Sequence, residues 1–339
     1  MTDKPILIWG AGAIGGILGA YLARAGHAVH MVDIVEDHVH AMREKGLAIE
    51  GPVEAFTQVL PASTPSELEG QFDRIILAVK AHHTESALDM LVPHLAPGGF
   101  ILSAQNGLNE IAISERVGIE NTVGCFVNYG ADWLEPGRIL YGNRAAVAVG
   151  ELDGQVTDRA RACHALLQIV EPDAVLTDNI WGYLWGKLGY GALLFATALT
   201  PLSMSDAMAR PDDTPVYQAL GHEVMRLAAA QKIKPLGFNG FDPDAFRTAD
   251  PAGMAVSLDA MVDHNRHTAK THSGIWRDLA VRKRRTEVDA QVGLLVGLGR
   301  KHGIETPTLA RMVELIHDIE EGRREQSPDL VKLMVPLCI

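Results

Sequence analysis

One lysine stands alone in a long stretch of uncharged residues. Between Asp178 and Asp206 the only formal charge is Lys187, within the segment WGYLWGKLGYGALLF at 181–195. Burial lowers the pKa of an ammonium that has no opposite charge beside it, which suits such a group to acid–base catalysis. The alternative is a lysine whose alkyl chain lies along a buried helix and whose charged end reaches solvent. The residues alone leave both interpretations open.

Small and apolar residues surround this lysine. Glycines occupy positions 186, 189 and 191, and their missing side chains predict room for a ligand beside the lysine. The most apolar run, Leu188–Leu199, has 12 residues, short of the roughly 20 that a bilayer requires. We therefore predict a buried helix and no membrane span.

A second chemical signal lies near the start of the chain, directly after an aliphatic run. In the pattern Gly-x-Gly-x-x-Gly, the first glycine permits a tight turn, the second lets backbone N–H groups approach a pyrophosphate, and the third packs helix against sheet. The helix N-terminus adds unpaired N–H groups and the positive end of its dipole. The pattern predicts a dinucleotide-binding loop, against the alternative of a glycine-rich turn without a ligand. Its residues are Gly10, Ala11, Gly12, Ala13, Ile14 and Gly15.

An acidic residue, Asp33, ends the next predicted strand, 18 residues after Gly15. A carboxylate at this position accepts hydrogen bonds from both ribose hydroxyls and repels a 2′-phosphate. The four residues that follow, IVED, contain no lysine or arginine that could hold such a phosphate. The sequence therefore predicts NAD as the cofactor, with NADP disfavoured. His38 and His40, just beyond, are predicted to be surface residues.

The elements that must position these residues alternate between strand and helix in the first half of the chain. This alternation predicts an α/β fold with a doubly wound parallel sheet of the Rossmann type. Ile139–Tyr141 and Ala145–Val149, joined by Gly142-Asn143, predict a hairpin that closes the sheet. The other predicted strands are Ile6–Trp9, Ala28–Val32, Arg74–Val79, Phe100–Ser103 and Thr122–Val127, and the predicted helices are Ala13–Arg24, Thr84–Leu95 and Asn109–Val117.

After about Pro172 the strand patterns give way to helical ones, which predicts an all-α C-terminal domain. We predict a dinucleotide-binding domain at 1–172, a substrate and catalytic domain at 173–325, and a C-terminal tail at 326–339. Residues 234–253 are rich in Pro, Gly and Asp and predict a long loop over the site. The predicted helices are Asp178–Leu199, Pro215–Gln231, Trp276–His302 and Pro307–Glu321.

Composition and charge exclude several classes of partner. A net charge of −12 opposes contact with phosphate backbones, so nucleic acid is not an expected partner. The three cysteines, Cys125, Cys163 and Cys338, fit no disulfide framework and no metal spacing, and they suit a reducing cytoplasm. The N-terminal residues show no secretion-signal pattern.

A group of histidines raises the question of a metal site. His264, His267 and His272 lie close in sequence to Asp259 and Asp263. Their spacings match no ligand motif, so we predict that no metal is bound there.

Four short motifs follow one another along the chain: GAGAIGG at 10–16, VKA at 79–81, QNG at 105–107 and WGKL at 185–188. A fifth is RTEVD at 285–289, followed by KHGIETP at 301–307. With these motifs in this order, the chain resembles the ketopantoate reductases (2-dehydropantoate 2-reductases) over nearly its whole length. Each motif is modest alone, and together they are specific.

The resemblance implies a catalytic pair. Lys187 matches the family's catalytic lysine, which donates a proton to the ketone oxygen as hydride arrives from the nicotinamide. Glu287 matches an active-site glutamate that contacts substrate and lysine. Without the family, Glu287 would be interpreted as a solvated helix residue paired with Lys283 or Arg284.

The resemblance also implies three binding residues. Asn106 matches an asparagine near the nicotinamide and substrate, although a turn residue would look the same. Lys80 matches a cofactor-side lysine, where an exposed lysine after a strand would otherwise be unremarkable. Ser273 matches a serine that binds the substrate carboxylate, but its spacing to Asp278 is one residue longer than the family's usual pattern.

The chain departs from the family at three places. Gly191 and Phe195 stand one and two helical turns after the lysine, where the family often has asparagines, which leaves open whether ketopantoate is the substrate. Asp33 replaces the basic residue with which the family commonly binds NADP. The lengthened segment near Trp276 and Arg277 could reshape the pocket and offer a guanidinium to a carboxylate.

These features predict an NAD(H)-dependent oxidoreductase that interconverts a small 2-oxo acid and its 2-hydroxy acid, with hydride supplied by the cofactor. The expected partner is a small carboxylic acid, and a homodimer is left open. One alternative is an NAD-dependent dehydrogenase of a polyhydroxy or 3-hydroxy acid in a catabolic pathway. Another is a non-catalytic NAD-sensing protein, against which an ionisable lysine in an apolar helix argues.

Overall fold

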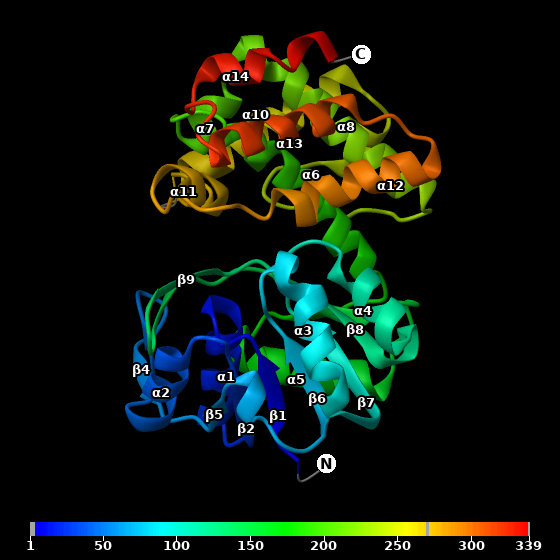
Figure 1. Ribbon diagram of the computed structural model, residues 1–339. Coiled ribbons are helices and arrows are strands. Elements are labelled where there is room, and N and C mark those ends of the chain that lie inside the picture. The colour runs from blue at the N-terminus through cyan, green and yellow to red at the C-terminus, as the bar shows by residue number, and fades with distance from the viewer. Residues whose placement is uncertain (1–3, 269–270, 338–339) are drawn as a thin grey trace. The chain divides into compact units, whose positions relative to one another are not determined.

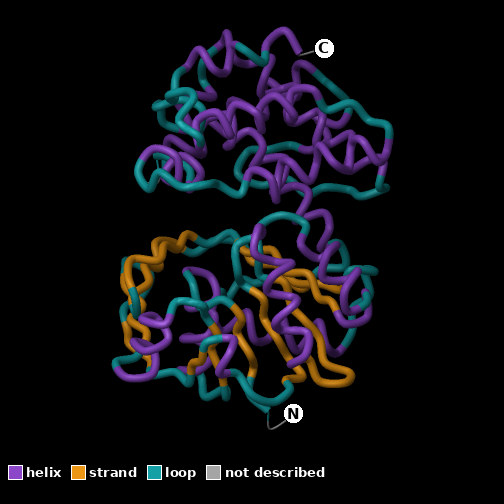
Figure 2. Tube along the Cα trace, viewed as in Figure 1, coloured by secondary structure: helices purple, strands orange, loops and turns teal. Residues whose placement is uncertain are grey.

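The computed structural model describes residues 4–268 and 271–337, so Cys338 lies outside the described residues. The chain divides into two compact units, Met1–Ile180 and Trp181–Ile339. The first unit contains sheets and helices (Figure 1). The described residues of the second unit form helices, turns and loops but no strand (Figure 2).

The main sheet of the first unit has, among the described residues, eight strands. All neighbouring pairs are parallel except β8 and β11, which are antiparallel. The chain places β2 on one side of β1 and later β6 on the other, so the strand order reverses at β1. In sheets of this kind a crevice for ligands opens there, beyond the carboxyl ends of the strands. The order is β12 (Val175–Leu176), β11 (Val147–Glu151), β8 (Thr122–Val127), β7 (Leu95–Ser103), β6 (Phe72–Leu77), β1 (Ile6–Trp9), β2 (Val29–Val32) and β5 (Ala62–Ser63).

Both faces of this sheet are buried, because alternate residues of β1 belong to two different apolar cores. Ile6 and Ile8 pack in one core with residues of α1 (Ala13–Arg24) and α5 (Asp158–Val170). Leu7 and Trp9 pack in the other with residues of α3 (Thr84–Leu91) and α4 (Asn109–Val117). The predicted doubly wound Rossmann-type sheet is therefore confirmed.

A second, smaller sheet has the order β4 (Phe56–Gln58), β3 (Leu47–Glu50), β10 (Arg138–Asn143) and β9 (Gly130–Glu135). The predicted hairpin between Ile139–Tyr141 and Ala145–Val149 is wrong. β10 pairs with β9 and β3, whereas β11 returns to the main sheet beside β8. The Gly142-Asn143 pair thus ends a strand of the small sheet rather than forming a hairpin turn.

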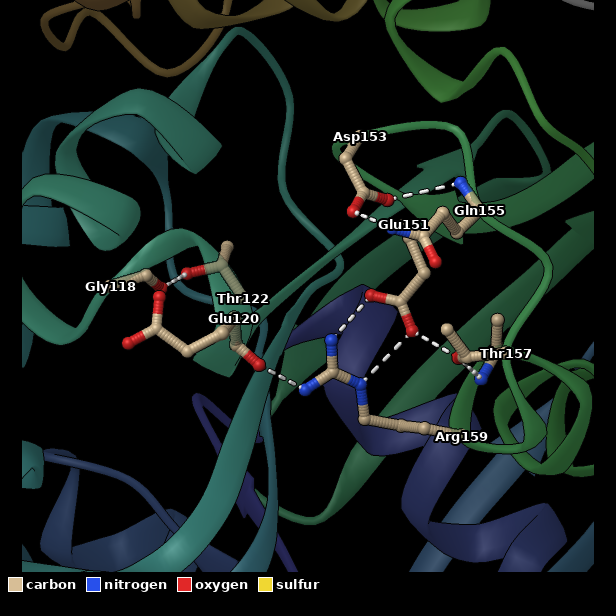
Figure 3. A network of polar contacts seen from close by, with 9 residues as sticks. Gly118, Glu120, Thr122, Glu151, Asp153, Gln155, Thr157 and Arg159 are labelled. Carbon is tan, nitrogen blue, oxygen red and sulfur yellow. Dashed lines mark hydrogen bonds and ion pairs between the residues drawn. The ribbon is translucent and has the colours of Figure 1, made fainter.

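A buried ion pair joins the start of α5 to β11 (Figure 3). The guanidinium of Arg159 binds both oxygens of Glu151 and also donates to the carbonyl oxygen of Glu120. Thr157 donates to the same Glu151 carboxylate and accepts the N–H of Ala160 at 3.0 Å as the N-cap of α5. Because Glu151 is only 4% exposed, removal of Arg159 would leave a buried carboxylate without its counterpart.

The second unit is built from helices, as predicted, but two predicted segments differ. The helix expected over Trp276–His302 is interrupted at 281–287, where Lys283 has a φ of +49°. The loop expected over 234–253 contains a short helix and the start of another. The helices are α6 (Ile180–Thr197), α7 (Met204–Met208), α8 (Thr214–Ala230), α9 (Pro243–Arg247), α10 (Pro251–Arg266), α11 (Gly274–Ala280), a π-helical turn (Asp289–Gly293), α12 (Leu294–His302), α13 (Pro307–Glu320) and α14 (Pro328–Lys332).

The apolar helix α6 packs inside the second unit through its glycines. A Cβ on Gly186 would overlap the carbonyl oxygen of Leu236, and one on Gly189 would overlap Phe241 and Met225. These two glycines therefore serve packing, and the prediction that they leave room for a ligand is wrong. In the part of the chain that the structure describes, no helix meets the length and apolarity required to cross a membrane.

A buried carboxylate on α8 holds the start of α13. Glu223 is 6% exposed, and its two oxygens accept the N–H groups of Thr308 and Leu309, each at 2.9 Å. These N–H groups belong to the first turn of α13, where no acceptor exists within the helix. Burial raises the pKa of Glu223, and the two N–H bonds oppose that rise.

We expect Glu223→Ala to lower the free energy of unfolding of the second unit by about 2–4 kcal/mol, because it leaves two buried donors unsatisfied and a cavity. Glu223→Gln keeps one acceptor and should cost about half as much. Urea unfolding followed by circular dichroism at 222 nm measures both. The control is Glu314→Ala on α13, whose side chain is 65% exposed. A Glu223→Ala protein as stable as this control would contradict the capping role.

Candidate functional site

The glycine-rich loop leads from β1 into α1. Gly10 has a φ of +95°, and a Cβ there would lie 2.8 Å from Val79. A Cβ on Gly15 would overlap the carbonyl oxygen of Gly10, where the helix packs against the turn. A Cβ on Gly12, in contrast, would meet no atom within 4 Å. The fold therefore requires the first and third glycines, whereas the second borders open space at the N-terminus of α1, which fits a bound pyrophosphate.

Asp33 lies directly after β2, and its carboxylate is held by two backbone donors. Oδ2 accepts the N–H of Ala11 at 2.9 Å, and Oδ1 accepts the N–H of Val35 at 3.0 Å. One of these donors belongs to the glycine-rich loop, so the structure brings the predicted ribose carboxylate and the predicted phosphate loop together. Each oxygen keeps acceptor capacity for a further hydrogen bond.

An open pocket of about 430 Å³ is lined by residues that follow Asp33 in the chain, beginning with Ile34. It lies beyond the carboxyl ends of β2 and β5, and its lining includes the exposed apolar side chains of Ile34 and Met90. Exposed apolar surface beside a few polar groups is typical of a site for a flat, mainly apolar ligand group. The lining residues are Ile34, Glu36, Thr64, Pro65, Ser66 and Met90.

A chain of hydrogen bonds links the segment after β6 to the segment after β7. The Gln105 amide donates to the carbonyl oxygen of Val79 at 3.0 Å and to Thr84 at 2.9 Å. Thr84 donates to Asn109 at 2.9 Å, and Asn109 donates to the carbonyl oxygen of Asn106 at 2.7 Å. These bonds fix the backbone on which Lys80 and Asn106 stand, Asn106 being exposed and Lys80 half-buried.

The sequence did not reveal Thr84 and Asn109 as parts of the site. Each is a single polar residue at the start of a helix, a position where such residues are common for local reasons. Only the pairing of β6 with β7 brings them together.

The prediction that His38 is a surface residue is wrong. His38, on α2 (Glu36–Glu44), is 1% exposed, and its Nε2 lies 2.8 Å from the carbonyl oxygen of Ala11. It stands on the buried face of α2 with Val39 and Met42. The helical spacing of these residues was the available signal. His40, on the other face, is exposed as predicted.

In the second unit, Lys187 is half-buried on α6 beside the buried side chains of Leu184 and Leu188. A Cβ on Gly191, one turn later, would meet no atom within 4 Å. Of the three glycines near the lysine, this one alone keeps its predicted role of leaving space.

Tyr190, on the same helix, forms a buried hydrogen-bonded pair with Asn265. Its hydroxyl lies 3.3 Å from Oδ1 and 3.1 Å from Nδ2 of Asn265, whose amide also donates to the carbonyl oxygen of Met261. Burial raises the pKa of Tyr190. The tyrosine therefore stays neutral near pH 7 and supports the local packing.

Ser273 directly precedes α11, and Glu287 ends the non-helical segment 281–287 that follows this helix. Ser273 is 3% exposed, and its oxygen accepts the N–H of Trp276 at 3.1 Å as the N-cap of α11. Glu287 is half-buried and follows Thr286, whose N–H and hydroxyl both donate to Glu320 at 2.7 Å. The end of α13 therefore anchors the segment that carries Glu287.

Two of the basic residues before Glu287 bind the carboxylate of Asp278. Arg284 and Arg282 both pair with Asp278, at 2.8 and 3.1 Å. Because residues 281–287 are not helical, the helical spacing that suggested a pair between Arg284 and Glu287 does not exist.

The histidines of the second unit do not gather around carboxylates in a metal-binding arrangement. Within the described ranges 4–268 and 271–337, no group of three or more His, Cys, Asp or Glu side chains could hold a metal ion. His267 lies next to Asp263 on the surface, whereas the ring of His272 packs against Trp276 with centroids 4.0 Å apart.

The two units thus contain different sets of candidate functional residues. In the first, a glycine-rich loop follows β1, a carboxylate held by two backbone N–H groups follows β2, and a pocket lies beyond the carboxyl ends of β2 and β5. In the second, a half-buried lysine stands on an apolar helix beside open space. This combination is the one expected of a dinucleotide-dependent oxidoreductase with a separate helical unit.

Comparison with known sequences places the chain in a family. Residues 6–154 match the family model "Ketopantoate reductase PanE/ApbA", and residues 179–320 match "Ketopantoate reductase PanE/ApbA C terminal". The chain therefore belongs to the ketopantoate reductase family. It is an NAD(P)-dependent oxidoreductase that acts on CH–OH groups.

Individual relatives cover almost the whole chain. The 2-dehydropantoate 2-reductase of Archaeoglobus fulgidus is 26% identical over 323 residues, covering 95% of this chain and all of its own. The enzyme of the same name from Mesorhizobium japonicum is 28% identical over 345 residues and covers 94% of this chain and 98% of its own. A D-mandelate dehydrogenase solved with NADH and anilino(oxo)acetate is 25% identical, with a TM-score of 0.81 over 94% of this chain and 99% of its own.

Proposed function

We propose that the protein is an NAD(H)-dependent enzyme that interconverts a small 2-oxo acid and its 2-hydroxy acid. The observation that carries the proposal is the open space at Gly12 next to the tethered Asp33 carboxylate. The space at Gly12 suits a pyrophosphate, and the carboxylate oxygens of Asp33 can accept hydrogen bonds from a ribose. Family membership and the half-buried lysine on α6 support a reaction at a carbonyl carbon.

The nicotinamide nucleotide, when bound, supplies or accepts the hydride. The loop at Gly10–Gly15 would hold its pyrophosphate, and Asp33 its adenosine ribose, with the adenine ring in the pocket at Ile34 and Met90. Lys80 and Asn106, on the backbone fixed by Gln105, are proposed to contact the nicotinamide half. These residues orient the nucleotide and take no part in bond breaking.

In the helical unit, Lys187 is proposed to hold a proton at Nζ and to give it to the carbonyl oxygen of the 2-oxo acid during reduction. In the reverse direction the same nitrogen takes the proton from the 2-hydroxyl group. Glu287 is proposed to contact this lysine and the substrate, and Ser273 to bind the substrate carboxylate. The anchoring of Thr286 by Glu320 supports the role of Glu287, since a catalytic carboxylate needs a fixed backbone.

Gly191 and Phe195 favour a substrate other than ketopantoate. They offer no polar contact, and the space at Gly191 can admit an apolar substituent. Phenylglyoxylate is therefore a candidate substrate besides ketopantoate. The similarity of the chain to a D-mandelate dehydrogenase favours it. Steady-state turnover with NADH and a panel of 2-oxo acids, including ketopantoate and phenylglyoxylate, tests the proposal. Turnover of polyhydroxy or 3-hydroxy acids alone would favour the catabolic dehydrogenase, and NADH binding without any turnover would favour an NAD sensor.

We expect NADH to bind more tightly than NADPH, because the carboxylate of Asp33 opposes a 2′-phosphate. Asp33→Ala should weaken NADH binding about tenfold or more, as hydrogen bonds to a charged group are lost, and should affect NADPH less. Fluorescence titration with each nucleotide measures both effects.

The matched control is Asp37→Ala, four residues further on and exposed, which should leave both affinities nearly unchanged. If NADPH bound more tightly than NADH to the unmodified protein, the proposed cofactor preference would be wrong.

A further inference from the structure

His38 is enclosed between three segments that lie far apart in the sequence. It belongs to α2, and its ring contacts the glycine-rich loop at Ala11 and the turn between β9 and β10 at Gly137. The ring of Trp133 on β9 packs edge-on against it, with centroids 6.2 Å apart. A polar ring in such a place is stable only if both nitrogens are hydrogen-bonded.

The two hydrogen bonds determine which nitrogen carries the proton. The backbone N–H of Gly137 donates to Nδ1 at 2.9 Å, so Nδ1 must present a lone pair. The proton of the neutral ring therefore lies on Nε2. That N–H donates to the carbonyl oxygen of Ala11, 2.8 Å away.

The bond to Ala11 determines where the next backbone N–H points. The peptide bond between Ala11 and Gly12 is trans, so its C=O and N–H groups point in opposite directions. Because the carbonyl of Ala11 points at His38, the N–H of Gly12 points to the other side of the loop. Gly12 is the N-cap of α1, and a Cβ on it would meet open space. The first N–H groups of a helix have no acceptor within the helix, so this N-terminus suits a pyrophosphate.

We propose that His38 is a positioning residue for the nucleotide: its Nε2–H holds the Ala11 carbonyl so that the Gly12 N–H is directed at the pyrophosphate. Asp33 accepts the N–H of Ala11, so both backbone polar groups of Ala11 are hydrogen-bonded. This inference deepens the proposed nucleotide binding and rests on it. It assigns to α2 a part in phosphate binding that is separate from recognition of the ribose.

Two substitutions separate the two nitrogens of the ring. His38→Gln carries an amide N–H with a reach close to that of Nε2, and His38→Asn carries an amide oxygen placed close to Nδ1. NADH titration of the full-length protein should show affinity about three- to tenfold weaker in His38→Ala and His38→Asn, the loss expected for one hydrogen bond. His38→Gln should stay within about twofold of the unmodified protein, while thermal unfolding temperatures of the Gln and Asn variants fall to a similar extent.

The matched control is His40→Ala, on the exposed face of α2, with a side chain that is 68% exposed. It should bind NADH like the unmodified protein. Equal losses of affinity in His38→Gln and His38→Asn, or unchanged affinity in a folded His38→Ala, would overturn the positioning role while leaving nucleotide binding intact. Failure of the unmodified protein to bind either NADH or NADPH would overturn both the proposed function and this inference.

Discussion

Lys187→Ala should lower turnover by about two orders of magnitude or more, which is the contribution usual for a general acid. The lysine is half-buried on α6 among apolar side chains, and beside it Gly191 leaves open space. Since the lysine is proposed to face the substrate, NADH affinity should change little. Pre-steady-state and steady-state assays with the preferred 2-oxo acid, together with NADH titration, measure the two quantities separately.

Lys187→Arg should not restore activity, because a guanidinium keeps its proton in the working pH range. The pH profile of turnover should also lose the limb that belongs to this group. Lys301→Ala, at an exposed position near the end of α12, is the control for removal of a positive charge and should remain active. Near-normal turnover in Lys187→Ala would contradict the proposed proton transfer. The better interpretation of Lys187 would then be a side chain that lies along the helix and extends to solvent.

Gly12→Val should abolish measurable nucleotide binding while the protein stays folded. The variant should stay folded because a Cβ at Gly12 meets no protein atom within 4 Å. The space that the valine would fill is the space that the proposed pyrophosphate would need. Titration with NADH and thermal unfolding of the same sample test the two halves together.

Gly15→Ala is the contrasting variant, since its Cβ would overlap the carbonyl oxygen of Gly10. It should lower the unfolding temperature, because the turn and α1 would have to move apart. The expected pattern is therefore lost binding without lost stability at Gly12, and lost stability at Gly15. Unchanged NADH affinity in folded Gly12→Val would show that the loop holds no pyrophosphate.

Features that depend on neighbouring residues could be predicted from the sequence. The glycine-rich loop, Asp33 and the apolar helix around Lys187 each follow from a local pattern of a strand, a turn or a charge-free run. The alternation of β1 between two cores likewise follows from its unbroken apolar sequence. These predictions needed no knowledge of distant partners.

Features that depend on residues far away in the sequence could not be predicted in this way. The helical spacing of His38 with Val39 and Met42 was a local signal of its burial, but its hydrogen bond from Gly137, 99 residues away, was not predictable from neighbouring residues. The hairpin prediction failed because β10 pairs with β3, and such long-range pairing leaves no local mark. The break after α11 arises where Arg282 and Arg284 turn back to Asp278, which a helical pattern of residues does not reveal.

The tethering of Asp33 has a consequence for how a nucleotide can be exchanged for another. A carboxylate held at one oxygen by Ala11 and at the other by Val35 would lose little further rotational freedom on binding the proposed ribose. For the same reason, a movement of this side chain that admits a bulkier, doubly charged group would break these two hydrogen bonds. On the proposed assignment, a variant that accepts a phosphorylated ribose would need replacement of the aspartate itself, because an arginine added nearby would also pair with this carboxylate.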